Sequence, residues 1–364
     1  MHTKTFTTGA DFLTNLPFDQ TKIIKKRARR ETSALAALLL STTALSYLLY
    51  FAASFWKPFL DSAAIHLLTR CFSFSITDAR LFWATLSESE IWTQFFSMAA
   101  ELITFFLPFA LFSKYIAKRP FDEVFPFCGG RKIKNFIAIF GCQMLMANAA
   151  SLLCSTIGDF VAPDFFANFP TEQAQSMSGS ELLVYFLSLC VFTPFVEEFV
   201  FRGAIFGTLR KYGFAYAAVA SALLFGLAHG GPSSMAYAFA SGFAFAAVYE
   251  ITGSIRYSVL LHAINNTVSF LFGTLFPQFA SDSFIESATL IYDLFIGALG
   301  FWGFVYLLRS LGNKKMYEDE PEPEKTSVSD PSRPVTLSAF FSVGTVFYIL
   351  LFLYNTVLIY NYGY

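Results

Sequence analysis

The chain contains few charged residues for its length. Asp, Glu, Lys and Arg make up 14% of its 364 residues, against about 25% in an ordinary soluble domain, whereas 55% of the residues are hydrophobic. The formal net charge is -1 at pH 7, so there is no excess positive charge to attract phosphates. These values exclude nucleic acid as an expected partner and indicate a membrane protein with several spans.

Cysteine is also scarce. The five cysteines are scattered and form no C-x-x-C pair, so they predict neither a disulfide framework nor a zinc knuckle. The sequence has no phosphate-binding G-x-x-x-x-G-K-[ST] loop, no dinucleotide-binding glycine pattern and no internal repeat. The first apolar run begins only at Ala34 and is long enough to stay in a membrane, so no cleaved signal peptide is expected.

Long apolar runs, in contrast, are frequent. Each was compared with the length needed to cross about 30 Å of hydrocarbon. The candidates are Ala34 to Trp56, Ile91 to Phe112, Phe136 to Ile157, Leu182 to Phe206, Phe214 to His229, Met235 to Ile251, Tyr257 to Phe276, Ala288 to Leu308 and Leu337 to Tyr360. The fifth and sixth are short or rich in glycine and alanine, which is typical of helices buried among others. We therefore expect an all-α fold, a polytopic transmembrane helical bundle of eight or nine helices.

The remaining segments divide the chain. An acidic, proline-containing stretch near the C-terminus cannot bury a core, so it predicts a disordered cytoplasmic linker. The expected parts are a cytoplasmic N-terminal segment at 1–33, transmembrane helices and loops at 34–180, a core at 181–276, a transmembrane helix at 277–311, the linker at 312–336 and a C-terminal transmembrane helix at 337–364.

The distribution of lysine and arginine predicts the orientation. Basic residues cluster at 22–30, 114–134, 210–211, 256 and 309–315, and a cytoplasmic N-terminus places all of these clusters on the cytoplasmic side. We expect an integral, multi-pass protein of the plasma membrane that contacts membrane lipids, with its C-terminus outside.

Three ionisable residues interrupt the fourth apolar run. Each charge at the centre of a bilayer costs roughly 2.5 to 3.5 kcal/mol, so Glu197, Glu198 and Arg202 require a partner network or a wet cavity. Residues four apart share a helix face, so Glu198 and Arg202 are expected to form an ion pair. Glu197 points about 100° away around the helix and is left without a cation, which suits it to accept a proton from water.

Histidine and asparagine mark two further runs. Phe225 and His229 are four residues apart, as are His262 and Asn266, so each pair is expected on one helix face. A buried imidazole binds metal or assists proton transfer, and an asparagine amide can donate to an oxyanion. Asn265 is an alternative to Asn266 as the inward residue. Straight vertical helices would not bring His262 to the depth of Glu197 and His229, so a tilt, a break near Gly203 or Gly207, or a dipping inner connection is expected.

Each of these residues has a plainer interpretation. Glu198 and Arg202 can serve as a structural ion pair, and a membrane histidine commonly only hydrogen-bonds a neighbouring helix. Glu101, in the second run, belongs to no motif and is interpreted as a buried contact between helices.

The motifs E-E-x-x-x-R, F-x-x-x-H and H-x-x-x-N occur here in that order, at Glu197 to Arg202, Phe225 to His229 and His262 to Asn266. In this the chain resembles the CPBP family, which includes the type II CAAX prenyl endopeptidases, the Abi-type proteins and bacteriocin self-immunity proteins. The resemblance covers about 181–276, a CPBP-like intramembrane protease core, and leaves the other helices without a signature.

The resemblance implies an intramembrane endopeptidase that cuts peptide or lipid-modified protein substrates. In that interpretation Glu197 activates water, His229 holds or polarises it, and His262 and Asn266 stabilise the oxyanion. Glu198, Arg202 and Phe225 are then supporting residues. Glu197, His229 and His262 are also a candidate set of ligands for zinc with one position open, although the sequence lacks the H-E-x-x-H helix of many zinc proteases. Both a glutamate protease and a metalloprotease therefore stay open.

Two other classes of function fit the same residues. A catalytically silent scaffold or immunity protein would bind a membrane partner through these helices. A proton-coupled transporter also places carboxylates and histidines in a membrane, but no pair of broken helices is repeated in two halves of this chain.

Overall fold

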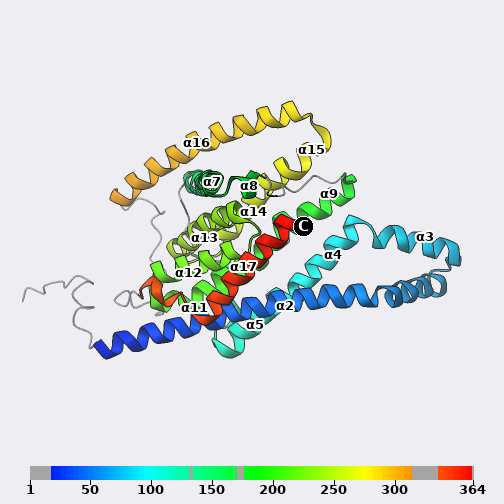
Figure 1. Cartoon of the computed structure of the whole chain (residues 1–364), viewed down its shortest axis with the longest axis horizontal. Helices are drawn as coiled ribbons and strands as arrows, with labels where there is room; N and C mark the ends of the chain where they lie inside the picture. Colours follow the sequence, from blue (N-terminus) through cyan, green and yellow to red (C-terminus); the bar gives the residue numbers. More distant parts are fainter. Residues whose placement is uncertain are drawn as a thin grey trace, which may run out of the picture.

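The computed structural model describes residues 18–130, 133, 135–167, 169, 176–313 and 335–362. The regular elements of these residues are all helical (Figure 1). Within this described part of the chain, eight helical spans are long and apolar enough to cross a membrane, and a ninth apolar helix, Phe214–Leu227, is shorter. The predicted all-α bundle of eight or nine membrane helices is therefore confirmed.

The helices with their bounds are α2 (Phe18–Cys71), α3 (Ile76–Ser87), α4 (Glu90–Glu101), α5 (Leu107–Leu111), α6 (Phe121–Val124), α7 (Phe136–Val161), α8 (Pro163–Ala167), α9 (Gly179–Phe186), α10 (Thr193–Glu198), α11 (Gly207–Leu209), α12 (Phe214–Leu227), α13 (Pro232–Thr252), α14 (Arg256–Phe270), α15 (Phe276–Phe279), α16 (Asp282–Asn313) and α17 (Val343–Tyr362). Short π-helical segments join several of them into continuous spans, at Leu102–Phe106, Phe112–Ile116, Leu187–Phe192, Phe199–Phe206 and Leu271–Leu275.

The first helix is longer than its apolar run. α2 extends to Cys71 through Pro58, and α3 follows it, so much of the expected polar connection after Trp56 is helical. Lys57 and Asp61 pair across the proline at 3.2 Å, and Trp83 of α3 donates a hydrogen bond to Asp61 at 2.7 Å. These contacts tie the end of α2 to α3, which folds back beside it in Figure 1.

The core of the bundle surrounds α12, α13 and the π-helical segment Phe199–Phe206, in which every residue is buried. In Figure 1, α2 and α17 run along one side of these elements, while α7 and α16 lie on the other. Glycines allow close approach between α7 and α16. A Cβ atom built at Gly303 would lie 2.2 Å from the carbonyl oxygen of Ala138, so only a hydrogen fits there.

The C-terminal helix packs on the N-terminal one. The amide of Gly344 donates to Ser33 Oγ at 3.0 Å, which fixes α17 against α2. The predicted disordered linker falls largely on residues 314–334, which lie outside the described residues, as do residues 1–17 of the predicted N-terminal segment.

Candidate active site

The span Gly179–Tyr212 carries the two carboxylates. It begins with a capping box, in which Ser178 and Glu181 satisfy each other's backbone amides. Pro194 lies inside the span, directly after the π-helical segment Leu187–Phe192, and a second π-helical segment follows α10. Such wide turns are common where a proline interrupts the ladder of hydrogen bonds and are frequent at functional sites.

Glu198 and Arg202 form the predicted ion pair. Arg202 Nε lies 3.1 Å from Glu198 Oε2, and both side chains are 0% exposed. The guanidinium also lies over two aromatic rings, 4.5 Å from the centroid of Phe225 and 5.2 Å from that of Phe245. The cation is thus enclosed by one carboxylate and by ring faces, which attract it electrostatically.

His262 of α14 joins the two glutamates. Its Nδ1 lies 3.1 Å from Glu198 Oε1, and its Nε2 lies 3.5 Å from Glu197 Oε2. The ring stacks on Phe245 with centroids 5.3 Å apart, which fixes its plane. Since Nδ1 faces the buried partner of Arg202, a proton on Nδ1 is donated to Glu198, and Nε2 is directed at Glu197. The Glu197 side chain is 20% exposed, so it is the accessible member of the pair.

The structure brings Glu197 and His262 to the same depth without a break at Gly203 or Gly207, because the span continues as a helix to Tyr212. α12 has 14 residues, which corresponds to a length of about 21 Å, less than the ~30 Å of a hydrocarbon core. His229 lies beyond its end, in the turn that leads to α13, and not on the helix as expected.

His229 nevertheless contacts Phe225, as its spacing predicted. Its Nδ1 lies 2.8 Å from the carbonyl oxygen of Phe225, and the two rings meet edge to face at 4.6 Å. The Phe225 ring also lies 5.6 Å from that of His262. Phe225 therefore packs against both imidazoles and against the Arg202 guanidinium.

Asn266 has a specific partner that sequence reasoning missed. Its Nδ2 donates to the carbonyl oxygen of Leu189 at 2.8 Å. In this π-helical segment the backbone N–H of Thr193 donates to the carbonyl oxygen of Ser188, five residues earlier. By the same spacing, an N–H at position 194 would donate to the carbonyl oxygen of Leu189. Pro194 has no N–H, so its carbonyl partner is left open, and Asn266 supplies the missing donor. The buried Asn265, the alternative inward residue, lies 3.5 Å from Ser241 Oγ.

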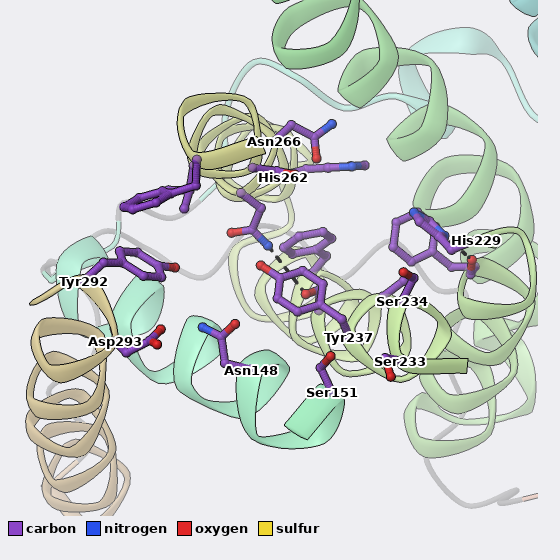
Figure 2. A pocket seen from close by; sticks show the side chains of 18 of the residues that line it. Asn148, Ser151, His229, Ser233, Ser234, Tyr237, His262, Asn266, Tyr292 and Asp293 are labelled. Carbon is purple, nitrogen blue, oxygen red and sulfur yellow. Dashed lines mark hydrogen bonds between the residues drawn. The ribbon is translucent and has the colours of Figure 1, made fainter. Parts of the chain in front are cut away.

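A cavity of about 480 Å³ adjoins these residues, between α7, α12, α13, α14 and α16. Its lining includes His229, His262, Asn265, Asn266 and many hydroxyl groups, and Figure 2 shows several of them facing one space. Glu197 is not one of the lining residues. His262 both contacts Glu197 and lines the cavity, so the imidazole links the carboxylate to this space.

Glu101 makes the predicted contact between helices and also borders the site. Its Oε2 accepts a hydrogen bond from Thr193 Oγ1 at 3.1 Å, which links α4 to α10. Thr193 lies one turn before Glu197 on the same helix face, and Glu101 and Glu197 interact electrostatically. The only signal for this role in the sequence is a lone glutamate within an apolar run.

The candidate zinc ligands do not form a metal site here. Among the described residues, no three His, Cys, Asp or Glu side chains are grouped closely enough to hold a metal ion. The Nδ1 atoms of His262 and His229 are directed at Glu198 and at the Phe225 carbonyl oxygen, which leaves the Nε2 atom of each imidazole as the nitrogen that could bind a metal. The zinc ligand set Glu197, His229 and His262 therefore stays a prediction.

Comparison with known families locates the same region. Residues 179–268 match the family model of the type II CAAX prenyl endopeptidase Rce1-like proteins. This segment is Rce1-like. The resemblance that the three motifs indicated is thereby confirmed, and the Rce1-like segment contains every residue of those motifs.

Two curated relatives cover overlapping parts of the chain. The membrane-embedded CAAX protease MroQ of Staphylococcus aureus (strain USA300) is 31% identical over 134 residues, which are 35% of this chain and 54% of MroQ. A Bacillus subtilis (strain 168) protein named "Putative membrane peptidase YdiL" is 31% identical over 107 residues, 29% of this chain and 42% of YdiL. The chain thus spans about half the length of these relatives. No solved structure matches it significantly.

Proposed function

We propose that this protein is an intramembrane endopeptidase that hydrolyses peptide bonds of membrane-associated substrates, with Glu197 as the base that activates water. The observation that carries the proposal is the contact of 3.5 Å between Glu197 and His262, at the edge of a polar cavity in an Rce1-like segment. The names of the two curated relatives support a protease of this class.

The proposed reaction needs one carboxylate and hydrogen-bond donors to the oxyanion. Glu197 takes a proton from water, the water oxygen bonds to the peptide carbonyl carbon, and the carbonyl oxygen becomes an oxyanion. The second amide hydrogen of Asn266 is the neutral candidate donor to that oxyanion, whereas His262 and His229, whose Nδ1 hydrogens go to Glu198 and to the Phe225 carbonyl oxygen, donate from Nε2 as imidazolium ions. When the C–N bond breaks, the leaving amine takes the proton back from Glu197. No step in this scheme passes through a metal.

The substrate class is proposed from the two neighbouring hollows. The polar cavity suits a peptide backbone, and a second hollow of about 400 Å³ shares Phe272 and Tyr292 with it and is otherwise lined mainly by apolar side chains of α15 and α16. A lipid chain on a CAAX-type or other lipid-modified peptide fits an apolar hollow of this size.

The decisive experiment uses the full chain in liposomes. Quenched peptides, with and without a prenyl group, are incubated with the wild type, Glu197→Gln and His262→Ala. We expect cleavage by the wild type and a loss of about 10²-fold to 10⁴-fold in Glu197→Gln, the usual contribution of a general base. Cleavage that survives both substitutions would refute the assigned site. A prenyl requirement would appear as faster cleavage of the prenylated peptides than of the unprenylated ones.

One observation favours a catalytically silent scaffold or immunity protein as the second candidate. Glu197 is not among the residues that line the described cavity, so its carboxylate serves equally well as part of a structural network with His262 and Glu198. No cleavage of any peptide, together with a cellular phenotype that Glu197→Gln leaves unchanged, would support this candidate.

We further propose that the protein lies in the plasma membrane with a cytoplasmic N-terminus. The basic residues of the first helix, from Lys22 to Arg30, support this orientation. Cysteine labelling tests it. A cysteine placed at Lys25 should react with an impermeant reagent only after the cells are opened.

A further inference from the structure

One charged residue of the cavity belongs to no motif. Asp293 lies on α16 and is the only charged residue of the apolar run Ala288 to Leu308, and no Lys or Arg is among the residues that line the cavity with it. Its neighbours Ile291 and Leu294 are each 66% exposed, as befits a helix on the lipid side of the bundle. A carboxylate on such a helix costs roughly 2.5 to 3.5 kcal/mol near the bilayer centre unless it faces a wet space.

The direction of the Asp293 side chain shows how this free-energy cost is avoided. Figure 2 shows its carboxylate turned toward the cavity, beside Tyr292 and Asn148. His229 lines the same cavity from the turn after α12, and His262 and Asn266 line it from α14. The carboxylate and the candidate catalytic groups therefore face a common space of about 480 Å³, within the range of about 300 to 1,000 Å³ that ligand pockets occupy.

We propose that Asp293 is a specificity residue that binds a basic side chain, lysine or arginine, of the peptide substrate. This inference rests on the proposed endopeptidase function. A peptide whose scissile carbonyl lies at His262 fills the cavity, and a cationic side chain on it meets Asp293 on the α16 wall. The hydroxyls of Ser151 and Tyr237 and the amide of Asn148 provide polar surface for the path between them. Asp293 is exposed, so a substrate can reach its carboxylate, which attracts a cation and repels an anion.

The experiment exchanges the charge on each side of the contact. N-acetylated quenched peptides, which carry no α-amine, hold lysine, norleucine or glutamate at each position around the scissile bond. They are incubated with the full chain in vesicles free of amine lipids, so that the side chain is the only source of the cation. The proteins are the wild type, Asp293→Asn, Asp293→Lys and, as a matched control, Glu286→Gln, a change at an exposed acid of α16 that is not a lining residue.

We expect the wild type to prefer one lysine peptide over its norleucine counterpart by about tenfold or more in kcat/KM, as for a charge-assisted hydrogen bond. Asp293→Asn should lose this preference while it still cleaves the norleucine peptide, Asp293→Lys should prefer glutamate, and Glu286→Gln should match the wild type. Cleavage by the wild type with no basic preference, or a preference that Asp293→Asn retains, would overturn the assignment. No cleavage of any peptide would instead refute the endopeptidase function, and the assignment with it.

Discussion

Removal of Arg202 should destabilise the protein strongly, because it leaves Glu198 buried without its cation. Both side chains are 0% exposed, so solvent cannot replace the lost partner. Breaking a buried pair from one side costs about 3 to 5 kcal/mol. His262 Nδ1 still contacts Glu198 Oε1 at 3.1 Å and keeps one hydrogen bond in place. We therefore expect Arg202→Met to fall at the lower end of the range, at about 3 kcal/mol.

A second substitution separates the charge from the packing. Replacing Glu198 by Gln in the Arg202→Met background removes the unpaired charge and keeps an oxygen to accept from His262. The double variant should lie within about 1 kcal/mol of the wild type, because neutral replacement of a buried pair is often tolerated. The two single costs would then be far from additive, as for residues in one network.

The assay measures reversible unfolding of the purified protein in bicelles, either by steric trapping or by detergent titration. Arg210→Met is the control, since Arg210 and Glu250 also form an ion pair but with side chains 20% and 28% exposed. A partly exposed pair should cost about 1 kcal/mol or less. The reasoning fails if Arg202→Met costs no more than Arg210→Met, or if the double variant is as unstable as the sum of the two singles.

Three further predictions concern packing, the π-helical segment and metal. Gly303→Ala should destabilise the protein by about 1 to 3 kcal/mol, because the added methyl group forces α16 away from α7. The control Gly297→Ala, with nothing within 4 Å of its Cβ, should change the free energy of unfolding by less than about 1 kcal/mol. Equal changes in the two variants would contradict this prediction. Asn266→Ala should lower the free energy of unfolding by about 1 to 3 kcal/mol, because it leaves the Leu189 carbonyl oxygen without a donor. The loss should be smaller in a Pro194→Ala background, which restores a backbone N–H at position 194. Additive effects in this double-mutant cycle would refute the pairing. Chelators should leave peptide cleavage unchanged, and a loss that added zinc reverses would refute the metal-free scheme.

Much of the fold could be predicted from the sequence, because membrane spans are set by length and hydropathy. The apolar runs match the observed spans closely, including the short α12. The ends of α2 could not be predicted in this way. Its extension to Cys71 depends on side-chain contacts with α3, which hydropathy does not report.

Local contacts among the candidate site residues were predictable from the sequence, but contacts between helices were not. The spacing of four residues predicted the Glu198–Arg202 ion pair and the Phe225–His229 contact, because both depend on local helix geometry. The contacts of His262 with two glutamates join α10 to α14, and only tertiary packing sets them. Asp293 carried a usable signal, a lone acid in an apolar run, which indicates a wet cavity but gives no partner.

The position of His262 explains why two adjacent glutamates can serve different purposes. Glu198 is fully enclosed by Arg202 and by His262 Nδ1, so its charge is committed to the framework. Glu197 meets the other ring nitrogen and keeps 20% of its side chain exposed, so it can still exchange a proton with water. Because one rigid imidazole contacts Glu198 through Nδ1 and Glu197 through Nε2, a change at the buried glutamate shifts the nitrogen that faces the accessible one. The structural ion pair and the proposed chemistry are therefore coupled through a single ring, and substitutions on the framework side should reduce cleavage even where the fold survives.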